Sequence, residues 1–243
     1  YFGTATNDNQ KRLEDIHMTL ENYFKYIFSN NNIITIEPLG NDGAFGSIFV
    51  LKFNDNYLRS IKGSSFAIRD YNARPCKRML IKLSYINPTL RGTDETIIGD
   101  KLAVSTDAFK YEVHIQKHVF KKTNSHLQPI TPLIYYQSIH DSENTKYYLN
   151  LIYQNSLQAG RVKIQNMQQI FTQYPGLNLG MIIMEMRDGY VTAHDLEQQN
   201  PAIINSVDFL AMTGEVLNRL HDVCRVTHGD FHKWNILINP TEA

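Results

Sequence analysis

Apolar residues recur along this chain at two spacings, and together they predict both helices and strands. Helical spacing predicts helices over residues 9–28, 109–120 and 207–223. Their apolar positions are 13, 16, 20, 24 and 27/28; 109, 113, 116/117 and 120; and 210, 213, 216/217, 220 and 223. Short apolar runs predict strands over 78–83, over 179–184 and directly after Asn235. The chain is therefore expected to be of the α+β class.

Composition narrows the function classes. The 243 residues are 42% hydrophobic, which is enough for an ordinary core in one or two domains. Lys+Arg and Asp+Glu both total 24, so zero net charge argues against a nucleic-acid partner or an anionic membrane surface. There is no apolar run of about eighteen residues, and we expect an intracellular, soluble protein. The two cysteines, Cys76 and Cys224, are far apart, which suits a reducing compartment.

The most informative segment is His228–Ile238, which contains H-G-D-x-H-x-x-N followed by an apolar strand. An Asp and an Asn on one turn between a helix and a strand can both face a single reaction centre. Phosphoryl transfer uses this arrangement: the Asp orients and deprotonates the attacking hydroxyl, and the Asn amide oxygen holds a magnesium ion. Asp230 and Asn235 are the candidates here. The segment resembles the catalytic loop of the protein-kinase-like superfamily, H-[R/G]-D-x-x-x-x-N.

The resemblance extends upstream to Leu39–Phe49, which is similar to the glycine-rich loop that closes over ATP phosphates. By that match Gly43 and Gly46 let the backbone approach the phosphates, and Phe45 covers the tip. Asn41 stands where the first glycine of the family pattern belongs, with Gly40 one residue earlier. The match implies nucleotide contacts from a set of six residues: Gly40, Gly43, Ala44, Phe45, Gly46 and Ile48. An ordinary glycine-rich hairpin between two strands is the alternative.

Two charged residues are expected to form a pair. Arg78–Leu83 resembles the V-A-I-K strand of kinases, which makes Lys82 the ligand of the α and β phosphates. Glu112, on the helix over 109–120, then corresponds to the glutamate that pairs with this lysine. Glu95 is a rival in the preceding segment, expected to be a loop. A solvated strand lysine is the other interpretation of Lys82.

Leu179–Tyr190 resembles the strand and hinge that link the two kinase lobes. The match implies that Met184 is the gatekeeper and that the Glu185 carbonyl and the Arg187 amide hydrogen-bond adenine. A core strand ending in a turn fits the same residues. His228 and His232 also invite a metal-site interpretation, but no Cys or acidic cluster accompanies them.

The resemblance implies a protein-kinase-like bilobal fold. An antiparallel sheet with the Glu112 helix forms the first lobe, and a mainly helical second lobe looks truncated. The expected organisation is a helical extension over 1–32, a first lobe over 33–184, and the hinge with the start of the second lobe over 185–243. Polar inserts are expected near 54–75, 87–106 and 141–176, most simply as surface loops.

Within the superfamily the chain is most similar to divergent serine/threonine kinases of large DNA viruses, which implies host cytoplasm or virion as the location. The implied activity is transfer of the ATP γ-phosphate to a protein hydroxyl, with ATP and Mg²⁺ as cofactors. Gly229 and His232 depart from protein kinases and occur in the aminoglycoside and choline phosphotransferase branch, so a small-alcohol acceptor is the runner-up. Only residues 236–243 follow Asn235, and the second magnesium ligand of kinases has no counterpart there. A nucleotide-binding module without catalysis is the third hypothesis.

Overall fold

The computed structural model describes residues 19–40, 46–62, 67–124, 129–204, 206–227 and 233–239 as a mixed α+β protein. Contacts divide it into two compact units, the first comprising Tyr1–Val113 and Ile134–Glu185 and the second His114–Leu133 and Met186–Ala243. A helix over residues 19–28 precedes the named elements of the first unit. These are β1 (Ile34–Pro38), β2 (Gly46–Phe53), α2 (Asp55–Ser60), β3 (Arg78–Asn87), β4 (Glu95–Ile98), β5 (Lys101–Ser105), the start of α3 (Thr106–Thr123), β6 (Ile134–His140), α4 (Ser142–Asn155), α5 (Gln158–Gln173) and β7 (Asn178–Glu185).

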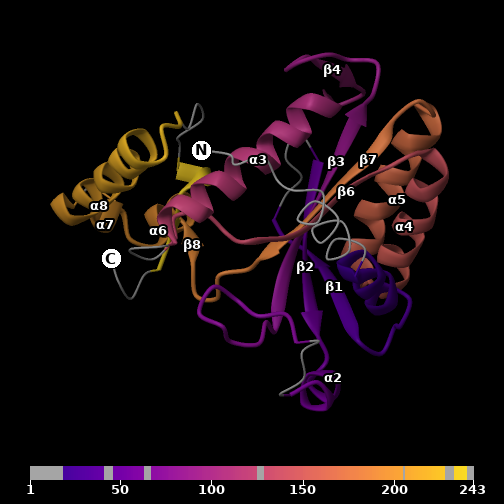
Figure 1. The fold of residues 1–243 in the computed structure, drawn as a ribbon, viewed down its shortest axis with the longest axis horizontal. Coiled ribbons are helices and arrows are strands. Elements are labelled where there is room, and N and C mark those ends of the chain that lie inside the picture. Colours follow the sequence, from indigo (N-terminus) through magenta and orange to yellow (C-terminus); the bar gives the residue numbers. More distant parts are fainter. Residues whose placement is uncertain are drawn as a thin grey trace, which may run out of the picture. The chain divides into compact units, whose positions relative to one another are not determined.

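A seven-stranded sheet organises the first unit (Figure 1). Antiparallel neighbours follow the order β1-β2-β3-β7-β6, while β5 pairs in parallel with the far end of β3 and β4 lies beyond β5. The long strand β3 therefore bonds to β2, β7 and β5. The strands predicted over 78–83 and 179–184 are confirmed as β3 and β7.

The two faces of β3 have different surroundings because successive side chains of a strand point to opposite faces. Met79, Ile81 and Leu83 are fully buried in the main core of the unit. The helix over 19–28, α4 and α5 supply much of the rest of this core, and Figure 1 shows them gathered beside the sheet. The alternate positions of β3, Leu80 and Lys82, face the other way and are only partly buried.

The segment 141–176, expected to be a surface insert, instead forms two core helices. The Asp141 side chain accepts the Asn144 N–H and starts α4. Tyr148, Ile152 and Ile164 are at most 2% exposed. The frequent Gln and Asn residues lie mainly on the solvent side, which hid the apolar stripe that holds the helices on the sheet. The loop interpretation of this segment was wrong.

The other two inserts also carry regular structure. Residues 54–75 include α2, which begins where the Asn54 side chain accepts the Asn56 N–H. Residues 87–106 contain β4 and β5, which extend the sheet. Of the helix predicted over 9–28, residues 19–28 are helical, and the earlier part lies outside the described residues. Phe24, Ile27 and Phe28 of this helix are at most 1% exposed.

The second unit contains the later part of α3 and short elements that follow β7. These are β8 (Val191–Thr192), α6 (Ala193–Gln199), α7 (Pro201–Ile204), α8 (Val207–Asn218), a π-helical segment (Arg219–Val223), a 3₁₀ turn (Lys233–Asn235) and β9 (Leu237–Ile238). The Ser206 side chain accepts the Phe209 N–H and begins α8. Continuous helical residues from Val207 to Val223 confirm the helix predicted there.

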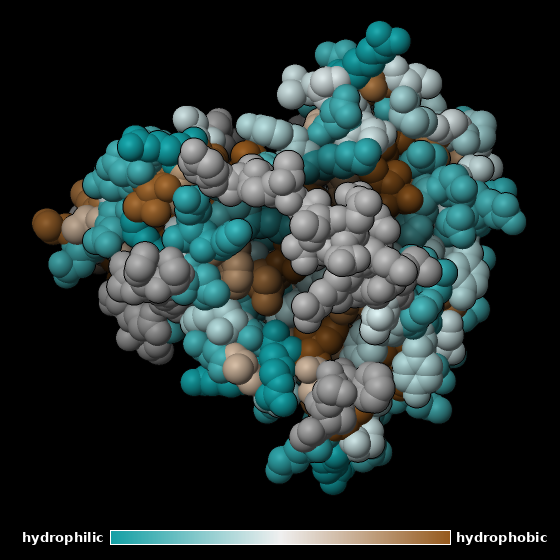
Figure 2. Space-filling model, viewed as in Figure 1, coloured by the Kyte–Doolittle hydropathy of each residue, from teal (hydrophilic) through white to brown (hydrophobic). Residues whose placement is uncertain are grey.

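Burial along α8 differs from the expected stripe. Leu210 is 61% exposed, and Phe209, outside the stripe, is buried. In the π-helical segment that follows, Val223 is 49% exposed, whereas Leu220 is buried as expected. Figure 2 shows hydrophobic residues at the surface over this helix. In the second unit Leu220 packs with Val119 of α3, so the helix is held by a narrower apolar strip than its sequence suggests.

Both cysteines, Cys76 and Cys224, are buried, and neither forms a disulfide. No helix in the described part of the chain is both long and apolar enough to cross a membrane.

A buried histidine makes the first unit sensitive to acid. His140, at the end of β6, stacks on the Tyr148 ring at 4.0 Å and shares a 2.7 Å hydrogen bond with the Ser138 hydroxyl. Burial lowers the pKa of His140 to about 4, despite the opposing charges of Glu21 and Asp141. The unfolded chain binds this proton near pH 6.5, so stability falls as the pH drops from there towards 4.

We predict that this histidine contributes about 2–3 kcal/mol to the loss of unfolding free energy between pH 7 and pH 4. The His140→Gln variant should have a shallower decline over that range, because glutamine does not titrate. Urea unfolding at several pH values measures the effect, with His114→Gln, an exposed position, as the control. Parallel pH profiles for wild type and His140→Gln would contradict the assignment.

Candidate functional site

Three side chains from neighbouring strands define one face of the sheet. Lys82 of β3 lies opposite Ile48 of β2 and opposite Ile182 of β7. Cross-strand partners point to the same side of a sheet, so the ammonium group of Lys82 rises between two apolar neighbours. Ile48 is 37% exposed, which leaves this face partly open in the first unit. Lys82 is therefore placed beside an accessible apolar surface.

The start of α3 packs on the same face. Phe109 and Val113 form an apolar cluster with Ile182 and Met184 of β7. Gly180 makes room for this contact, since a Cβ atom there would lie only 2.8 Å from the Phe109 ring. Phe109 and Val113 thus fix the rotation of the helix, and Glu112, one residue before Val113, is presented to the sheet.

Lys82 and Glu112 form an ion pair, with the Lys82 ammonium donating to Glu112 Oε1. Their side chains are 24% and 43% exposed. A pair so accessible contributes at most about 1 kcal/mol to folding. Of the three N–H donors of the ammonium, Glu112 accepts one, and no other hydrogen bond engages Lys82 among the described residues. The pair positions a cation with spare donors over the apolar face.

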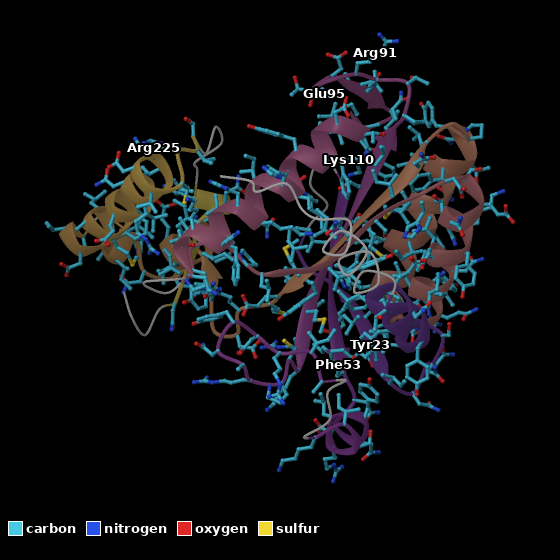
Figure 3. All side chains as sticks on the ribbon, in the orientation of Figure 1. Tyr23, Phe53, Arg91, Glu95, Lys110 and Arg225 are labelled. Carbon is cyan, nitrogen blue, oxygen red and sulfur yellow. The ribbon has the colours of Figure 1, made fainter. Side chains whose placement is uncertain are left out.

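The rival residue Glu95 does not occupy this position. It lies on strand β4, not in a loop as expected, and it is exposed (Figure 3). Its backbone partner in the sheet is Val104 of β5. The strand pairing therefore keeps Glu95 near the β4 edge of the sheet, and Glu112 is the carboxylate that meets Lys82.

Apolar residues beside Lys82 form a floor that sequence reasoning only partly identified. Met184, predicted as the gatekeeper, lies opposite Leu80, and Leu80 lies opposite Val50 of β2. Leu80 and Val50 were missed. Period-two alternation could have found them, because Leu80 is two residues before Lys82 and Val50 is two after Ile48. Together with Ile48 they line the face of the sheet that carries Lys82, where Val50 and Met184 are buried and Ile48 is 37% exposed.

The described glycines of the predicted phosphate loop have local structural roles. Gly40 has φ +62°, and its carbonyl accepts a hydrogen bond from the Lys163 ammonium of α5 at 2.7 Å. Gly46 has φ +148°, and a Cβ atom there would lie 1.9 Å from the Leu83 carbonyl oxygen. Close contact between β2 and β3 thus requires glycine at 46. Gly43, Ala44 and Phe45 lie outside the described residues.

The two hinge candidates have distinct surroundings. Glu185 ends β7 in the first unit, where its side chain is 2% exposed and its carboxylate accepts the Tyr71 N–H at 3.1 Å. Arg187 belongs to the second unit. Its guanidinium donates to the Thr131 carbonyl at 3.4 Å and lies 5.8 Å from the centre of the Tyr190 ring.

In the second unit, Asn235 ends the 3₁₀ turn and is exposed. The strand after it, β9, pairs with β8, and the Ala193 N–H donates to the Ile236 carbonyl at 2.8 Å. An ion pair between Lys233 and Glu197 anchors the turn to α6, a contact that the sequence motif did not indicate. Asp230, the predicted catalytic base, lies outside the described residues.

Metal ligands are sparse in the described part of the chain. It contains no group of three or more His, Cys, Asp or Glu residues that could hold an ion. Asn235 is the only predicted magnesium ligand that it includes, and one amide oxygen does not make a magnesium site. His228 and His232, the alternative metal pair, lie outside the described residues.

Gly46→Ala should destabilise the protein by at least about 2 kcal/mol, because the added methyl group would collide with the backbone of β3. Chemical denaturation would measure the change. The matched control is Gly176→Ala, since nothing lies within 4 Å of a Cβ atom there. Equal unfolding midpoints for the two variants would contradict the close packing of β2 on β3.

Comparison of the chain with protein-family models, curated proteins and solved structures finds no match. A function for this chain is therefore inferred from its own residues and their geometry.

Proposed function

We propose that the protein is an ATP-dependent phosphotransferase, a serine/threonine protein kinase that transfers the γ-phosphate to a protein hydroxyl. The observation that carries the proposal is the Lys82–Glu112 ion pair. Two residues far apart in the sequence, expected to pair on the basis of a kinase-like pattern, form an ion pair between strand β3 and helix α3.

The surroundings of the pair support nucleotide binding. An ammonium group held by a carboxylate can direct its remaining donors at phosphate oxygens. The apolar floor of Ile48, Leu80 and Met184 lies on the same face and suits an adenine ring. The Glu185 carbonyl at the end of β7 is one proposed partner of adenine, and the amide of Arg187, two residues later, is the other.

The arrangement of the first unit is consistent with the smaller lobe of a kinase-like bilobal fold. An antiparallel sheet carries the lysine, and a helix packed on one face carries its glutamate partner. In this proposal the second unit is the start of the other lobe and contributes the catalytic loop.

The proposed mechanism divides the work among residues of this chain. Lys82, oriented by Glu112, would hold the α and β phosphates, and backbone N–H groups of the glycine-rich segment would contribute further donors to them. Asp230 orients the acceptor hydroxyl and takes its proton, and Asn235 is a magnesium ligand. Magnesium supplies neutralisation of phosphate charge when it is bound. Most of the rate enhancement then comes from positioning and from electrostatic stabilisation.

A second candidate, phosphorylation of a small alcohol, is favoured by one feature of the sequence. Gly229 and His232 replace the residues that protein kinases usually carry in the catalytic loop, and they resemble the aminoglycoside and choline phosphotransferase pattern. The acceptor assay below separates the two candidates.

Lys82→Ala should reduce kcat/KM for ATP by roughly 100-fold, because it removes a donor directed at the phosphates. Steady-state kinetics measures the loss. Lys110→Ala is the matched control, since Lys110 is an exposed lysine on α3 (Figure 3). Comparable losses in both variants would remove Lys82 from the site.

Incubation with γ-labelled ATP and magnesium should transfer label to generic protein substrates, and Asp230→Asn should lower the rate by about 10³-fold or more while ATP still binds. Small alcohols and aminoglycosides are offered in separate reactions. Label found only on a small alcohol would select the second candidate. Binding of ATP without transfer to any acceptor would leave a nucleotide-binding module.

A further inference from the structure

A closed loop over residues 68–76 connects α2 to β3. The Asp70 N–H donates to the Arg74 carbonyl at 2.8 Å, and the Asp70 carboxylate accepts the N–H groups of Asn72 and Arg74 at 2.9 and 2.8 Å. Ala73 adopts a left-handed conformation with φ +60°. These internal hydrogen bonds hold the loop in one conformation, so it can pack on neighbouring elements as a rigid unit.

The loop is attached to the end of β7 through a buried carboxylate. Glu185 Oε1 accepts the Tyr71 N–H at 3.1 Å, across 114 positions of the sequence. Glu185 pairs in register with Met79, whereas Lys82 pairs with Ile182. Because side chains alternate along β7, the Glu185 carboxylate lies on the face opposite the Lys82 ammonium. The loop therefore docks behind the proposed nucleotide site.

A second contact holds the same loop to β6. The Cys76 thiol and the Tyr135 hydroxyl lie 2.9 Å apart. Tyr135 sits at a register shift of β6, between Ile134 and Tyr136, and an irregularity of this kind changes the direction of a side chain. Burial, followed by the hydrogen bond with Cys76 and the negative charge of Glu185, raises the pKa of Tyr135. The Tyr135 hydroxyl thus stays protonated, next to the Cys76 thiol at the end of the loop.

We propose that Glu185 is a positioning residue for nucleotide binding. Its carboxylate clamps the 68–76 loop and thereby fixes the peptide group of Glu185, whose carbonyl is the proposed acceptor for adenine. This inference rests on the proposed function. Glu185 is the last residue of β7 and of the first unit, and it pairs with Met79 on one side, so the side-chain contact with Tyr71 adds a second restraint at this strand end. The loop thus fixes the position of the Glu185 carbonyl that accepts from adenine, without contacting the nucleotide itself.

A carboxylate is well suited to this role. Among neutral and charged acceptors, the charged ones form the stronger hydrogen bonds, and a buried carboxylate that loses a partner is strongly disfavoured. The end of β7 and the loop are therefore coupled, because displacement of either one breaks the hydrogen bond from the Tyr71 N–H to the Glu185 carboxylate. Glutamine at 185 keeps an oxygen acceptor of the same reach, whereas alanine removes it.

The test separates ATP binding from turnover. Steady-state kinetics with ATP and a protein acceptor is measured for wild type, Glu185→Ala, Glu185→Gln, Asp70→Ala and Asp55→Ala. Glu185→Ala should raise KM for ATP by roughly tenfold, the scale of one lost charged hydrogen bond, and change kcat by less than about twofold. Glu185→Gln should recover most of the affinity.

Asp70→Ala removes the internal acceptor of the loop and leaves β7 intact, so it should raise KM in the same direction. If Glu185→Ala does not fold, the KM of Asp70→Ala for ATP tests the positioning role instead. Asp55→Ala removes an exposed carboxylate from α2 in the same connecting segment and should behave as wild type.

Unchanged KM in both Glu185→Ala and Asp70→Ala, in folded and active protein, would overturn the positioning role while the proposed function stands. A fall in kcat that follows the loss of melting temperature, with KM constant, would overturn it too by showing a purely structural residue. Absence of ATP binding in wild type would instead refute the proposed function, and the inference with it, before any variant is compared.

Discussion

The first unit depends on the alternation of side chains along β3. Strand β3 is hydrogen-bonded to β2 on one side and to β7 on the other, so its side chains cannot exchange faces without breaking the sheet. Its core-facing residues are fully buried, and Lys82, on the opposite face, meets the helix α3. A shift of one residue would bury the ammonium group and expose Ile81 or Leu83, at a cost of several kcal/mol. The hydrophobic core therefore fixes the position of the lysine.

The position of Glu112 follows from packing rather than from charge. Phe109 and Val113 seat α3 on β7, and Gly180 provides the space for the Phe109 ring. Because the ion pair is accessible to water, it adds little to stability. The apolar contacts hold α3 on the sheet, and this docking brings Glu112 within reach of Lys82. A helix held in this way can present its carboxylate to the lysine without relying on the salt bridge for its own docking.

Local patterns predicted the elements whose apolar residues are evenly spaced. The α3 and α8 helices were identified from such spacing and β3 and β7 from short apolar runs, and the Lys82–Glu112 pairing followed from a family-like motif. The polar composition of 141–176 concealed α4 and α5, although Tyr148 and Ile152 are spaced as helix neighbours. The Glu185 carboxylate could not be assigned, because its partner Tyr71 is brought to it only by tertiary structure. The exposure of Leu210 likewise depends on which face of α8 packs against other elements, and the spacing of apolar residues alone does not predict this.

Helices α4 and α5 follow β6 and precede β7 in the sequence. The two strands nevertheless pair directly and antiparallel, as the strands of a hairpin do, so the two helices form a long insertion in the connection between them. In packing they are indispensable, because Leu149, Ile152 and Ile164 help to cover the sheet. A shortened relative that kept all seven strands but lost this insertion would need another cover for the same face. The two helices therefore limit how far this connection can be shortened, even though the hydrogen-bonded pairing of β6 with β7 does not involve them.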